Sequence, residues 1–574
     1  MTLAGAPLKT ASGKRWRLRG RFPEEALPGT QYQPLVRHLL WHRGVRTAAE
    51  AAAFTEARDP IHDPRLLPDI EPALDRIVRA IDDGELIAVY GDFDVDGVTA
   101  SAILLEGLTA AGARVIPYIP DRFSEGYGVN TPAIESLHRA GATLIITADC
   151  GTSSVEEIAA GRRLGADTIV LDHHTVPPVL PAAVALVNPK RADSVYPEPE
   201  LSSGGLAFKL IAALCERLRR PFDGTRYLDL VALSTVCDMA PLRGENRWLV
   251  REGLRSLART QRPGLRALME VAGCDPIRAD ASTIGFVIGP RLNAAGRLDH
   301  ARRALDLLLE TDADRAREMA LHLSALNQQR QAATTAACDL ARDLLAREDP
   351  DAPLIFVGHA DIPSGIVGLV AARLMEEHYR PAVVYERGEP ASRASCRSIP
   401  EFDITGALRT CPELMVRFGG HRAAAGFTAE NAKLPALKER LIRCAEEELG
   451  GVDLIPALDI DAAIPLHRVN GKLIGALAQL APFGVGNPEP VFLSRDLEVT
   501  DLRTMGDNGE HVRLSIRDGR LTWPAVAFGI PDGSADDLAP GARIDAVYTF
   551  SADRGSDGAM ELRLLDFAPS SPAV

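Results

Sequence analysis

The sequence lacks long apolar runs, and its cysteines are few and scattered. No uninterrupted apolar segment reaches the ~18 residues that a membrane-spanning helix needs. No apolar stretch follows the basic residues of the first 21 positions, as a signal peptide would require. Eight cysteines occur among 574 residues, with no CxxC pair. This usage favours a reduced cytoplasm and argues against a disulfide framework or a structural zinc site.

Lysine is also scarce, since seven lysines stand beside 57 arginines in an alanine-rich chain. We attribute the imbalance to GC-rich codon usage, so the positions of arginines carry more meaning than their number. The net charge of −14 argues at first against a polyanionic partner. Residues 1–50 and 243–303, however, each carry a surplus of six positive charges. This pattern argues against a protein that coats DNA with its whole surface. It is compatible with one strand bound along a defined path.

The composition is that of an ordinary globular protein, with 46% hydrophobic and 25% charged residues. Apolar segments at 86–90, 114–119, 143–147 and 167–171 alternate with stretches that favour helices, two of which should start at Val98 and near Ser153. Buried strands alternating with helices predict a parallel sheet covered on both faces. We assign residues 51–310 to this α/β domain and expect ligands outside the carboxyl ends of its strands.

The remaining chain divides into four further parts. No glycine or proline occurs between Gly296 and Pro350. A helix over 312–348 would be about 55 Å long, so we interpret residues 311–349 as a connector between two lobes. Residues 350–451 predict a second α/β lobe. Short alternating strands predict a small OB-type barrel over 452–574, with a turn at 507–509, and residues 1–50 form a basic segment.

Acidic and histidine side chains collect where the strands of the first domain end. They are Asp92, Asp94 and Asp96 after one strand, Asp149 after another, Asp172, His173 and His174 after a third, and Asp238 after the apolar run 228–236. Each motif alone also has a structural explanation, such as a helix cap. Together, carboxylates at this density would repel one another unless cations bound them. Oxygen-rich ligation with imidazole suits Mn²⁺ or Mg²⁺ better than zinc, and two such ions suit phosphoryl-ester hydrolysis.

These residues carry a resemblance to a known family. Residues 91–97, Asp149, Asp172-His173-His174 and Asp238 match in order the four motifs of the DHH phosphoesterase superfamily, and 289–297, 395–399, 419–427 and 482–490 resemble its RecJ family of bacterial 5′→3′ exonucleases. The resemblance covers roughly residues 70–570. It implies an α/β protein with DHH and DHHA1-like lobes joined by a long helix, plus an OB-like barrel. It also implies hydrolysis of single-stranded DNA to 5′-mononucleotides with two Mn²⁺ or Mg²⁺ ions, in DNA repair and recombination.

The resemblance implies roles for individual residues as well. The expected metal ligands are Asp94, Asp96, Asp149, His173 and Asp238, with Asp149 bridging the two ions and His174 as a further catalytic residue. Asp92 and Asp172 are expected to support these ligands or to contact phosphate, because a metal-bound imidazole needs an outer partner.

Several other residues are candidates for contact with DNA. The DNA and phosphate candidates are Arg291, Asn293 and Arg297 in a Gly/Pro/Asn-rich loop, Arg397 with Ser398, and Gly420 with His421. For Gly420 an ordinary turn before an alanine-rich helix is the alternative. Arginines at every fourth position from Arg243 to Arg259 predict a helical stripe, which a solvated helix face explains equally well. Trp523 and Tyr548 are candidates for base stacking, although barrel aromatics more often fill the core.

We therefore predict a monomeric cytoplasmic exonuclease that binds single-stranded DNA and no membrane, with a single-strand-DNA-binding protein and a helicase as candidate partners. One alternative is a DHH phosphodiesterase for short oligonucleotides or cyclic dinucleotides, which would not need the barrel. A haloacid-dehalogenase-type phosphatase also has a motif like residues 93–98, but the His-His pair does not fit it. A catalytically silent single-strand-binding protein is the third alternative. The preference for DNA over RNA stays open.

Overall fold

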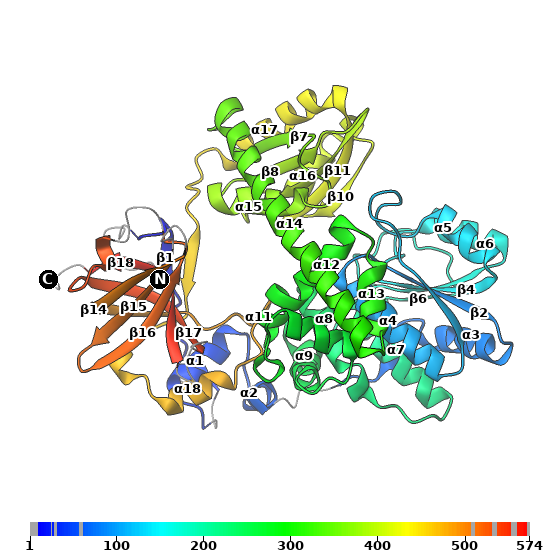
Figure 1. Cartoon of the computed structure of the whole chain (residues 1–574), viewed down its shortest axis with the longest axis horizontal. Helices are drawn as coiled ribbons and strands as arrows, with labels where there is room; N and C mark the ends of the chain where they lie inside the picture. Colours follow the sequence, from blue (N-terminus) through cyan, green and yellow to red (C-terminus); the bar gives the residue numbers. More distant parts are fainter. Residues whose placement is uncertain are drawn as a thin grey trace. The chain divides into compact units, whose positions relative to one another are not determined.

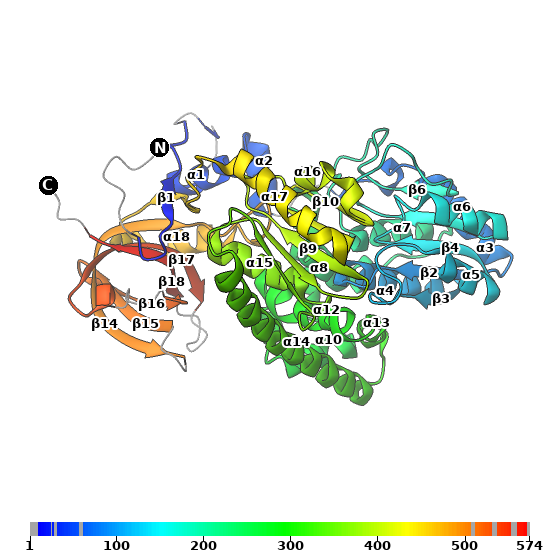
Figure 2. The ribbon, with the colours of Figure 1, turned by 90° about the horizontal axis from the view of Figure 1, so that it is seen from above.

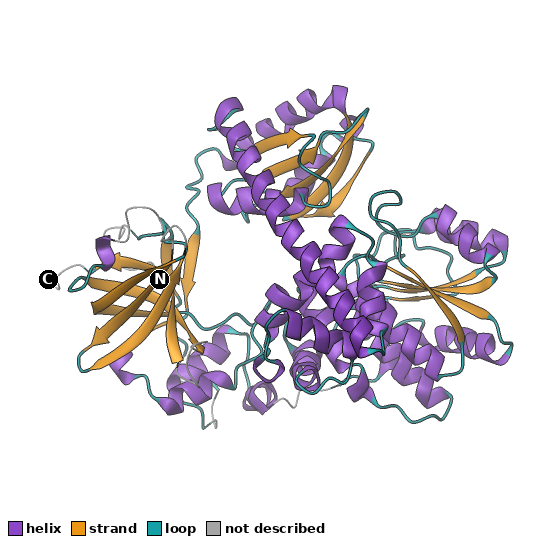
Figure 3. Ribbon diagram, viewed as in Figure 1, coloured by secondary structure: helices purple, strands orange, loops and turns teal. Residues whose placement is uncertain are grey.

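The computed structural model describes residues 10–23, 26–27, 31–56, 61–506, 511–530, 536–552 and 560–570. The chain forms two compact units, one of residues 59–452 and one that combines 1–58 with 453–574. Figure 3 shows the sheets in orange and the helices that accompany them in purple. Within the described ranges, no helix is both long and apolar enough to cross a membrane. The turn predicted at 507–509 lies outside these ranges.

The unit of residues 59–452 begins with the predicted parallel sheet. Its strands are β2 (Leu86–Gly91), β3 (Arg114–Tyr118), β4 (Ala142–Ala148), β5 (Asp167–Leu171) and β6 (Ala185–Val187), in the order β3-β2-β4-β5-β6. All four pairings are parallel, so the carboxyl ends of β2, β4 and β5 lie side by side at one edge. The residues of β2 after Leu86 are buried, as expected for a strand covered on both faces.

Helices surround this sheet and extend beyond it. They are α3 (Ile70–Asp82), α4 (Val95–Ala110), α5 (Thr131–Arg139), α6 (Val155–Leu164), α7 (Ser203–Arg217), α8 (Leu228–Cys237), α9 (Gly244–Leu257), α10 (Pro263–Val271), α11 (Ala281–Thr283), α12 (Gly289–Leu298) and α13 (Arg302–Leu309). A π-helical turn at Ile284–Ile288 joins α11 to α12. Helix α4 is almost wholly buried because it contacts the sheet as well as α7, α8 and α13.

Two predicted helix starts need correction. Helix α4 starts at Val95, three residues before the predicted Val98, because the Asp94 side chain caps it by accepting from the backbone of Asp96 and Gly97. Helix α6 follows Ser154, one residue after the predicted cap Ser153. The apolar run 228–236 is helix α8 and not a strand, so Asp238 stands at a helix end.

The predicted long helix is confirmed as α14 (Ala313–Glu348), 36 residues or about 54 Å long, with Asp312 as its N-cap. Its first half packs buried residues such as Leu323 into the core around the first sheet, and its second half packs Ala341 and Leu345 into a separate core. Figure 1 shows α14 leading from the helices near α12 and α13 to the second sheet. Seen from above, α10 and α12 lie beside it (Figure 2).

The second lobe contains a mixed sheet in the order β10-β11-β9-β8-β7. Its elements are β7 (Ile355–His359), α15 (Val367–His378), β8 (Ala382–Glu386), β9 (Ala391–Arg397), α16 (Ile404–Arg409), β10 (Arg417–His421), β11 (Ala424–Glu430) and α17 (Leu434–Leu449). Strands β7 and β8 are parallel, whereas β9, β10 and β11 pair antiparallel. Residues 424 and 425 belong to β11, so the alanine-rich helix considered after Gly420 is wrong.

The other unit is built around the predicted barrel. Its strands are β14 (Phe492–Met505), β15 (His511–Asp518), β16 (Leu521–Phe528), β17 (Arg543–Ala552) and β18 (Met560–Pro569). Because β14 also pairs with β17, these five strands close into a barrel. The short strands β12 (Ala457–Ile460) and β13 (Ala462–Ala463) and helix α18 (Gly471–Ala478) precede β14.

The basic N-terminal segment lies in this second unit. Strand β1 (Arg15–Leu18) pairs in parallel with β12, and α1 (Pro34–His42) and α2 (Ala48–Glu56) contribute to the barrel's apolar core. The side chain of Arg17 pairs with Asp459 and that of Arg19 with Asp461. These arginines are therefore partly neutralised by acidic residues of the same unit.

Candidate metal centre and phosphate site

The predicted carboxylates and histidines converge at the carboxyl edge of the first sheet. In the described ranges, three overlapping groups of side chains each place their ligand atoms within 4.8 Å of one another. The groups are Asp96, His173 and Asp238; Asp149, His173 and His174; and Asp92, Asp94 and Asp149. Asp149 and His173 each belong to two groups. Asp92, which we expected outside the ligand set, lies as close to Asp94 and Asp149 as a ligand would.

Asp96 is held by residues that the sequence analysis did not identify. Its carboxylate accepts hydrogen bonds from the backbone of Ser203 at 2.8 Å and Gly204 at 3.0 Å, both in the first turn of α7. The hydroxyl of Ser234 on α8 also donates to it. A helix N-terminus stabilises a buried carboxylate through its free N–H groups and its dipole. The Ser-Gly-Gly start of α7 was the available signal.

Asp149 adopts an unusual backbone conformation, with φ of 69° in the left-handed region. Its Oδ1 accepts from the Ser203 hydroxyl at 3.0 Å and lies 3.2 Å from Nε2 of His173. Burial raises the pKa of Asp149 well above its usual range, and the negative charges of Asp96 and Asp94 raise it further. Strained backbone and a raised pKa at one buried carboxylate are typical of a functional site.

The other carboxylates show the same need for positive charge. Oδ1 of Asp92 is buried and has no hydrogen-bond partner in the described part of the chain. Burial raises the pKa of Asp92, and the negative charge of Asp94 raises it further. Burial and the charges of Asp96 and Asp94 raise the pKa of Asp238 to about 8. Buried carboxylates with unsatisfied oxygens are stabilised by hard divalent cations. The oxygen-rich donor set with imidazole therefore fits Mn²⁺ or Mg²⁺.

His174 differs from His173 because it is paired with Asp172. Its Nδ1 donates to Oδ1 of Asp172 at 2.7 Å, and Asp172 also accepts from the backbone of Thr152 at 2.9 Å. Burial lowers the pKa of His174, but the hydrogen bond and charge of Asp172 outweigh it and raise that pKa to about 9. The ring is partly exposed and faces the hydroxyl of Tyr127 at 3.3 Å. At neutral pH His174 is therefore a cation beside the carboxylate groups.

A cluster of four arginines lies next to these carboxylates. Burial lowers the pKa of Arg297 to about 10. The positive charges of Arg122, Arg330 and Arg397 lower it as well, which shows that these guanidinium groups are neighbours. Among the described residues none of the four has an ion-pair partner within 4.0 Å, and Arg122 stacks over the Phe93 ring at 4.5 Å. Four neighbouring guanidinium groups without a carboxylate partner form a site for an anion such as phosphate.

The arginines reach this cluster from four separate segments of one unit. Arg122 follows β3, Arg297 is on α12, Arg330 is on α14 and Arg397 ends β9. Sequence reasoning identified Arg297 and Arg397 but missed Arg122 and Arg330, because neither of these two lies in one of the sequence motifs described above. Only the packing of the second lobe against the first brings the four together.

The segment with Arg291, Asn293 and Arg297 is not the predicted loop but helix α12. Pro290 is compatible with a helix because it occupies the first turn. Gly296 permits close packing, since a Cβ there would lie 2.6 Å from the Phe93 carbonyl oxygen. Arg291 donates to the Val287 carbonyl, while its Nε is buried without a partner in the described ranges.

Three further predicted contacts differ in their surroundings. The hydroxyl of Ser398 is buried and donates to the Phe402 carbonyl at 2.9 Å, so its proton is used within its own lobe, and phosphate binding by this residue stays a prediction. Gly420 and His421 are exposed residues of strand β10. The His421 carbonyl accepts from Thr405, and its ring remains open to solvent. Arg397 is the remaining predicted residue of this lobe that reaches the arginine cluster.

The base-stacking predictions need one correction. Tyr548 is fully buried in the barrel core, and its hydroxyl forms a 2.8 Å hydrogen bond with Ser494, so it offers no face to a base. Trp523 is half-buried and packs 5.8 Å from Phe550. Among the described barrel residues, Phe528 is an exposed aromatic, with 55% of its surface accessible and the guanidinium of Arg563 5.9 Å from its ring centre.

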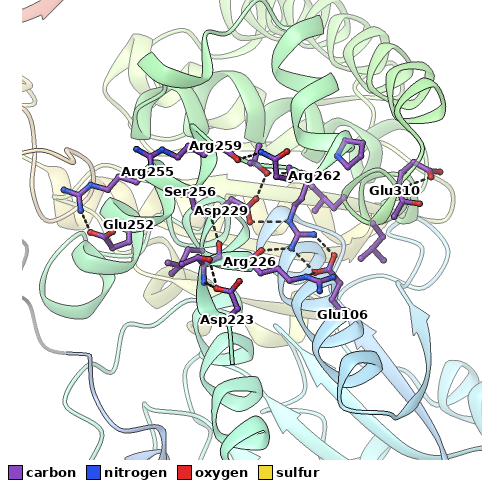
Figure 4. Close-up of a pocket in the computed structure, with 18 residues that line it drawn as sticks. Glu106, Asp223, Arg226, Asp229, Glu252, Arg255, Ser256, Arg259, Arg262 and Glu310 are labelled. Carbon is purple, nitrogen blue, oxygen red and sulfur yellow. Dashed lines mark hydrogen bonds and ion pairs between the residues drawn. The ribbon is translucent and has the colours of Figure 1, made fainter. Parts of the chain in front are cut away.

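The predicted arginine stripe over 243–259 is not one exposed face. Arg247 on α9 is fully buried, and Arg255 pairs with Glu252. The far end of this region lines a cavity of about 740 Å³ at the ends of α4 and α8 opposite the carboxylates (Figure 4). There Arg262 donates to Glu106 and Asp229. These charged side chains in the wall of the cavity therefore neutralise one another.

Comparisons with known proteins agree with this arrangement. Residues 86–235 match the DHH family N-terminal domain, 351–447 the DHHA1 domain, and 460–561 the RecJ OB domain. These ranges fall inside the predicted domains 51–310, 350–451 and 452–574. The single-stranded-DNA-specific exonuclease RecJ of Bacillus subtilis is 36% identical over 547 residues, which are 94% of this chain and 69% of that protein.

Solved structures of similar proteins contain the predicted metals. RecJ from Thermus thermophilus in complex with Mn²⁺ matches with a TM-score of 0.82 and 31% identity, over 97% of this chain and 80% of that one. The complex of the same protein with Mg²⁺ matches with a TM-score of 0.77 and 31% identity, over 97% and 79% of the two chains. This chain is thus similar to these RecJ proteins in both sequence and fold over nearly its whole length.

Proposed function

Because the chain belongs to the RecJ family of single-stranded-DNA-specific exonucleases, we propose that it removes 5′-mononucleotides from the 5′ end of single-stranded DNA. The observation that carries this proposal is the set of three overlapping carboxylate and histidine groups beside four arginines that have no carboxylate partner among the described residues. The first fits metal-dependent phosphodiester hydrolysis, and the second fits a phosphate. Together they support a hydrolytic centre beside a binding site for the end of a nucleic acid strand.

We propose that two Mn²⁺ or Mg²⁺ ions serve as the cofactor, which the Mn²⁺ and Mg²⁺ complexes of the Thermus thermophilus relative support. Asp94, Asp96, Asp149, His173 and Asp238 are the proposed ligands, and Asp92 is a further candidate. When bound, such ions lower the pKa of a coordinated water and stabilise the negative charge that develops on phosphorus. The chain's own contribution is to keep these ligands in place, and the bonds from α7 to Asp96 serve that purpose.

We propose that the four arginines recognise the terminal 5′-phosphate and thereby set the direction of digestion. Arg122 and Arg297 lie close enough to Asp94 for its charge to affect their pKa values. A phosphate held there would leave the next phosphodiester near the carboxylates. His174, kept as a cation by Asp172, can donate a hydrogen bond to an oxygen of that phosphodiester. A strand without a free 5′ end could not present its phosphate in this way.

The test is digestion of single-stranded DNA carrying a label at either end. With Mn²⁺, a 5′-labelled 20-mer should release labelled mononucleotide at once, whereas a 3′-labelled one should give a ladder of shortened products. EDTA should abolish both reactions, and Asp149→Ala should abolish them in Mn²⁺. Retention of activity by Asp149→Ala would refute the mechanism.

Substrate length separates the alternatives. Hydrolysis of dinucleotides without digestion of the 20-mer would favour the short-oligonucleotide phosphodiesterase. Binding of Mn²⁺ and of the 20-mer without any nucleotide release would favour a silent binding protein. The barrel, with Phe528 and Arg563 exposed on it, supports a longer substrate because cations and aromatics together bind single strands.

We further propose that the enzyme works in the cytoplasm as a monomer, in DNA repair and recombination. Its eight cysteines are all free, which suits a reducing compartment. A helicase that exposes single strands, and a single-strand-DNA-binding protein, are the partners that such a strand-selective reaction would use. Co-purification with either protein, and the mass of the particle in solution, would test these proposals.

A further inference from the structure

One loop of the first lobe forms a wall of the candidate site. This loop, residues 121–128, lies between β3 and α5 and carries Arg122 of the arginine cluster. It also carries Tyr127, whose ring lies 6.3 Å from that of Phe93 and whose hydroxyl faces His174. The position of this loop therefore decides where two side chains of the site stand.

The loop is tied to its own lobe mainly at its acidic residues and its end. Asp121 accepts from the backbone of Phe123 and Ser124, which shapes the turn. Glu125 accepts from the Tyr118 hydroxyl at 2.7 Å, and the Gly128 carbonyl accepts from Tyr90 at 3.0 Å. These bonds anchor the second half of the loop to the sheet.

The outer part of the loop is held from the second lobe. Nη1 of Arg393 on β9 donates to the Phe123 carbonyl at 3.0 Å. The guanidinium of Arg417 on β10 covers Gly126, since a Cβ there would lie 3.6 Å from its Nη2. The two contacts join residues 270 and 291 positions apart in sequence, so they depend on the two lobes being together.

The same strand connects this contact to the arginine cluster. Alternate residues of β9 face one side, and its burial pattern places Arg393, Ser395 and Arg397 on the less buried side. Arg397 donates to Ser395 at 2.9 Å and stands in the cluster, while Arg393 reaches the loop that carries Arg122. One face of the central strand β9 thus supplies one cluster arginine and contacts the loop that carries another.

The lobes are also in close contact at Arg297. Its Nη1 donates to the Gly365 carbonyl at 3.0 Å, and a Cβ at Gly365 would lie 2.2 Å from the Arg297 carbonyl oxygen. The backbone of α12 is therefore fitted against the second lobe with no room for a side chain. Arg297 contacts both lobes through this packing, and Arg397 contacts Ser395 within strand β9. Arg122 stacks on Phe93 of its own lobe, but it stands on a loop whose outer part is held from the second lobe.

We propose that Arg393 is a positioning residue that tethers the 121–128 loop to the second lobe, so that the phosphate site is complete only when the lobes are in contact. This inference rests on the proposed function for its kinetic consequence. Without the tether, the loop would hold Arg122 in place for only a fraction of the time. The apparent affinity for a 5′-phosphorylated strand would then be the intrinsic affinity multiplied by that fraction, while the bound complex reacts normally.

The experiment compares Arg393→Ala with Arg393→Lys and with a control, Arg443→Ala. Arg443 is an exposed arginine of the same lobe whose one ion-pair partner among the described residues is Glu439, one helical turn away. Amide hydrogen exchange of residues 122–128 is measured in EDTA, and KM and kcat are measured for a 5′-phosphorylated single-stranded 20-mer in Mn²⁺.

In Arg393→Ala we expect exchange in the loop to rise and KM to rise, each about 3- to 10-fold, as for loss of one hydrogen bond, with kcat within about twofold. Arg393→Lys should recover part of both effects, and Arg443→Ala should show neither. Unchanged exchange in Arg393→Ala would overturn the tether. Raised exchange with unchanged KM, or a fall in kcat at constant KM, would overturn its role in phosphate binding.

The exchange measurement also separates this inference from the proposed function. If the wild-type protein fails to digest the 20-mer, the proposed function fails, yet exchange still decides whether Arg393 holds the loop. If digestion is normal and exchange is unaffected by Arg393→Ala, the inference alone fails.

Discussion

Replacing Asp149 by asparagine should make the metal-free protein more stable while removing its response to metal. Asp149 belongs to two of the three ligand groups, with oxygens within 4.8 Å of those of Asp92 and Asp94. At this separation and an effective dielectric constant of about 20, one ionised pair repels by ~3.5 kcal/mol. Since protonation relieves part of that repulsion, we expect Asp149→Asn to raise the free energy of unfolding in EDTA by about 1–3 kcal/mol.

The asparagine substitution isolates charge from shape. Its amide oxygen can still accept from the Ser203 hydroxyl, and asparagine tolerates the left-handed backbone at this position. Asp149→Ala, in contrast, should gain less because alanine in that conformation is destabilised by roughly 1–2 kcal/mol. The order of stability in EDTA should therefore be asparagine variant, then alanine variant, then wild type or close to it.

Metal should offset most or all of the asparagine variant's advantage in stability. A ligand that binds the folded state alone, at a hundred times its Kd, stabilises it by about 2.7 kcal/mol. Wild type should gain this increment with Mn²⁺ and Asp149→Asn should not, because the carboxylate shared by two ligand groups is gone. The assay is urea unfolding followed by circular dichroism, in EDTA and in Mn²⁺. An asparagine variant that is less stable than wild type in EDTA, and still gains stability from Mn²⁺, would refute the reasoning.

Three further predictions concern other parts of the chain. Lys209→Met should lower the free energy of unfolding by about 3–5 kcal/mol in urea titrations, because it leaves the fully buried Glu245 without its ion-pair partner. Adding Glu245→Leu should restore most of this loss. A loss below about 1 kcal/mol from the single variant would contradict the prediction. Burial and the charge of Glu245 raise the pKa of Glu198 to about 7, so its folded form keeps a proton that the unfolded form has lost, and its contribution to stability declines as pH rises from about 4.5 to 7. Glu198→Gln should remove that decline and, after discounting for partial exposure, be about 1–2 kcal/mol more stable than wild type at pH 8 and equal at pH 4; equal stability at both values would argue against it. Phe528→Ala should weaken binding of a single-stranded 20-mer by about 1–3 kcal/mol in anisotropy titrations with EDTA, whereas Tyr548→Phe should leave binding unchanged and only lose the core hydrogen bond; equal effects of the two would contradict the assignment of the exposed face.

Much of the site could be predicted because its residues follow local patterns. The acidic residues after β2 and β4 and the Asp-His-His after β5 each come directly after a buried apolar strand. Parallel strands meet at one edge, so the ends of neighbouring strands had to lie together. The long glycine- and proline-free stretch likewise predicted α14, since little in it could end a helix.

Local patterns misled where a residue type fits two conformations. Glycine, proline and asparagine in 289–297 favour a loop, yet Pro290 occupies a first helical turn and Gly296 is needed for packing against Phe93. Four-residue spacing from Arg243 to Arg259 suggested an exposed stripe, but α9 turns Arg247 into the core.

The sequence by itself determined the chemistry of this protein: which strands end in carboxylates and histidines, and therefore which cations and which reaction they suit. Only the tertiary structure decided what surrounds that chemistry. The start of α7 supports Asp96, and Arg122, Arg297, Arg330 and Arg397 gather from segments up to 275 residues apart. The physical reason is that strand ends are set by short-range hydrophobic patterning, whereas a cluster of like charges forms only where the packing of whole lobes holds it against its own repulsion.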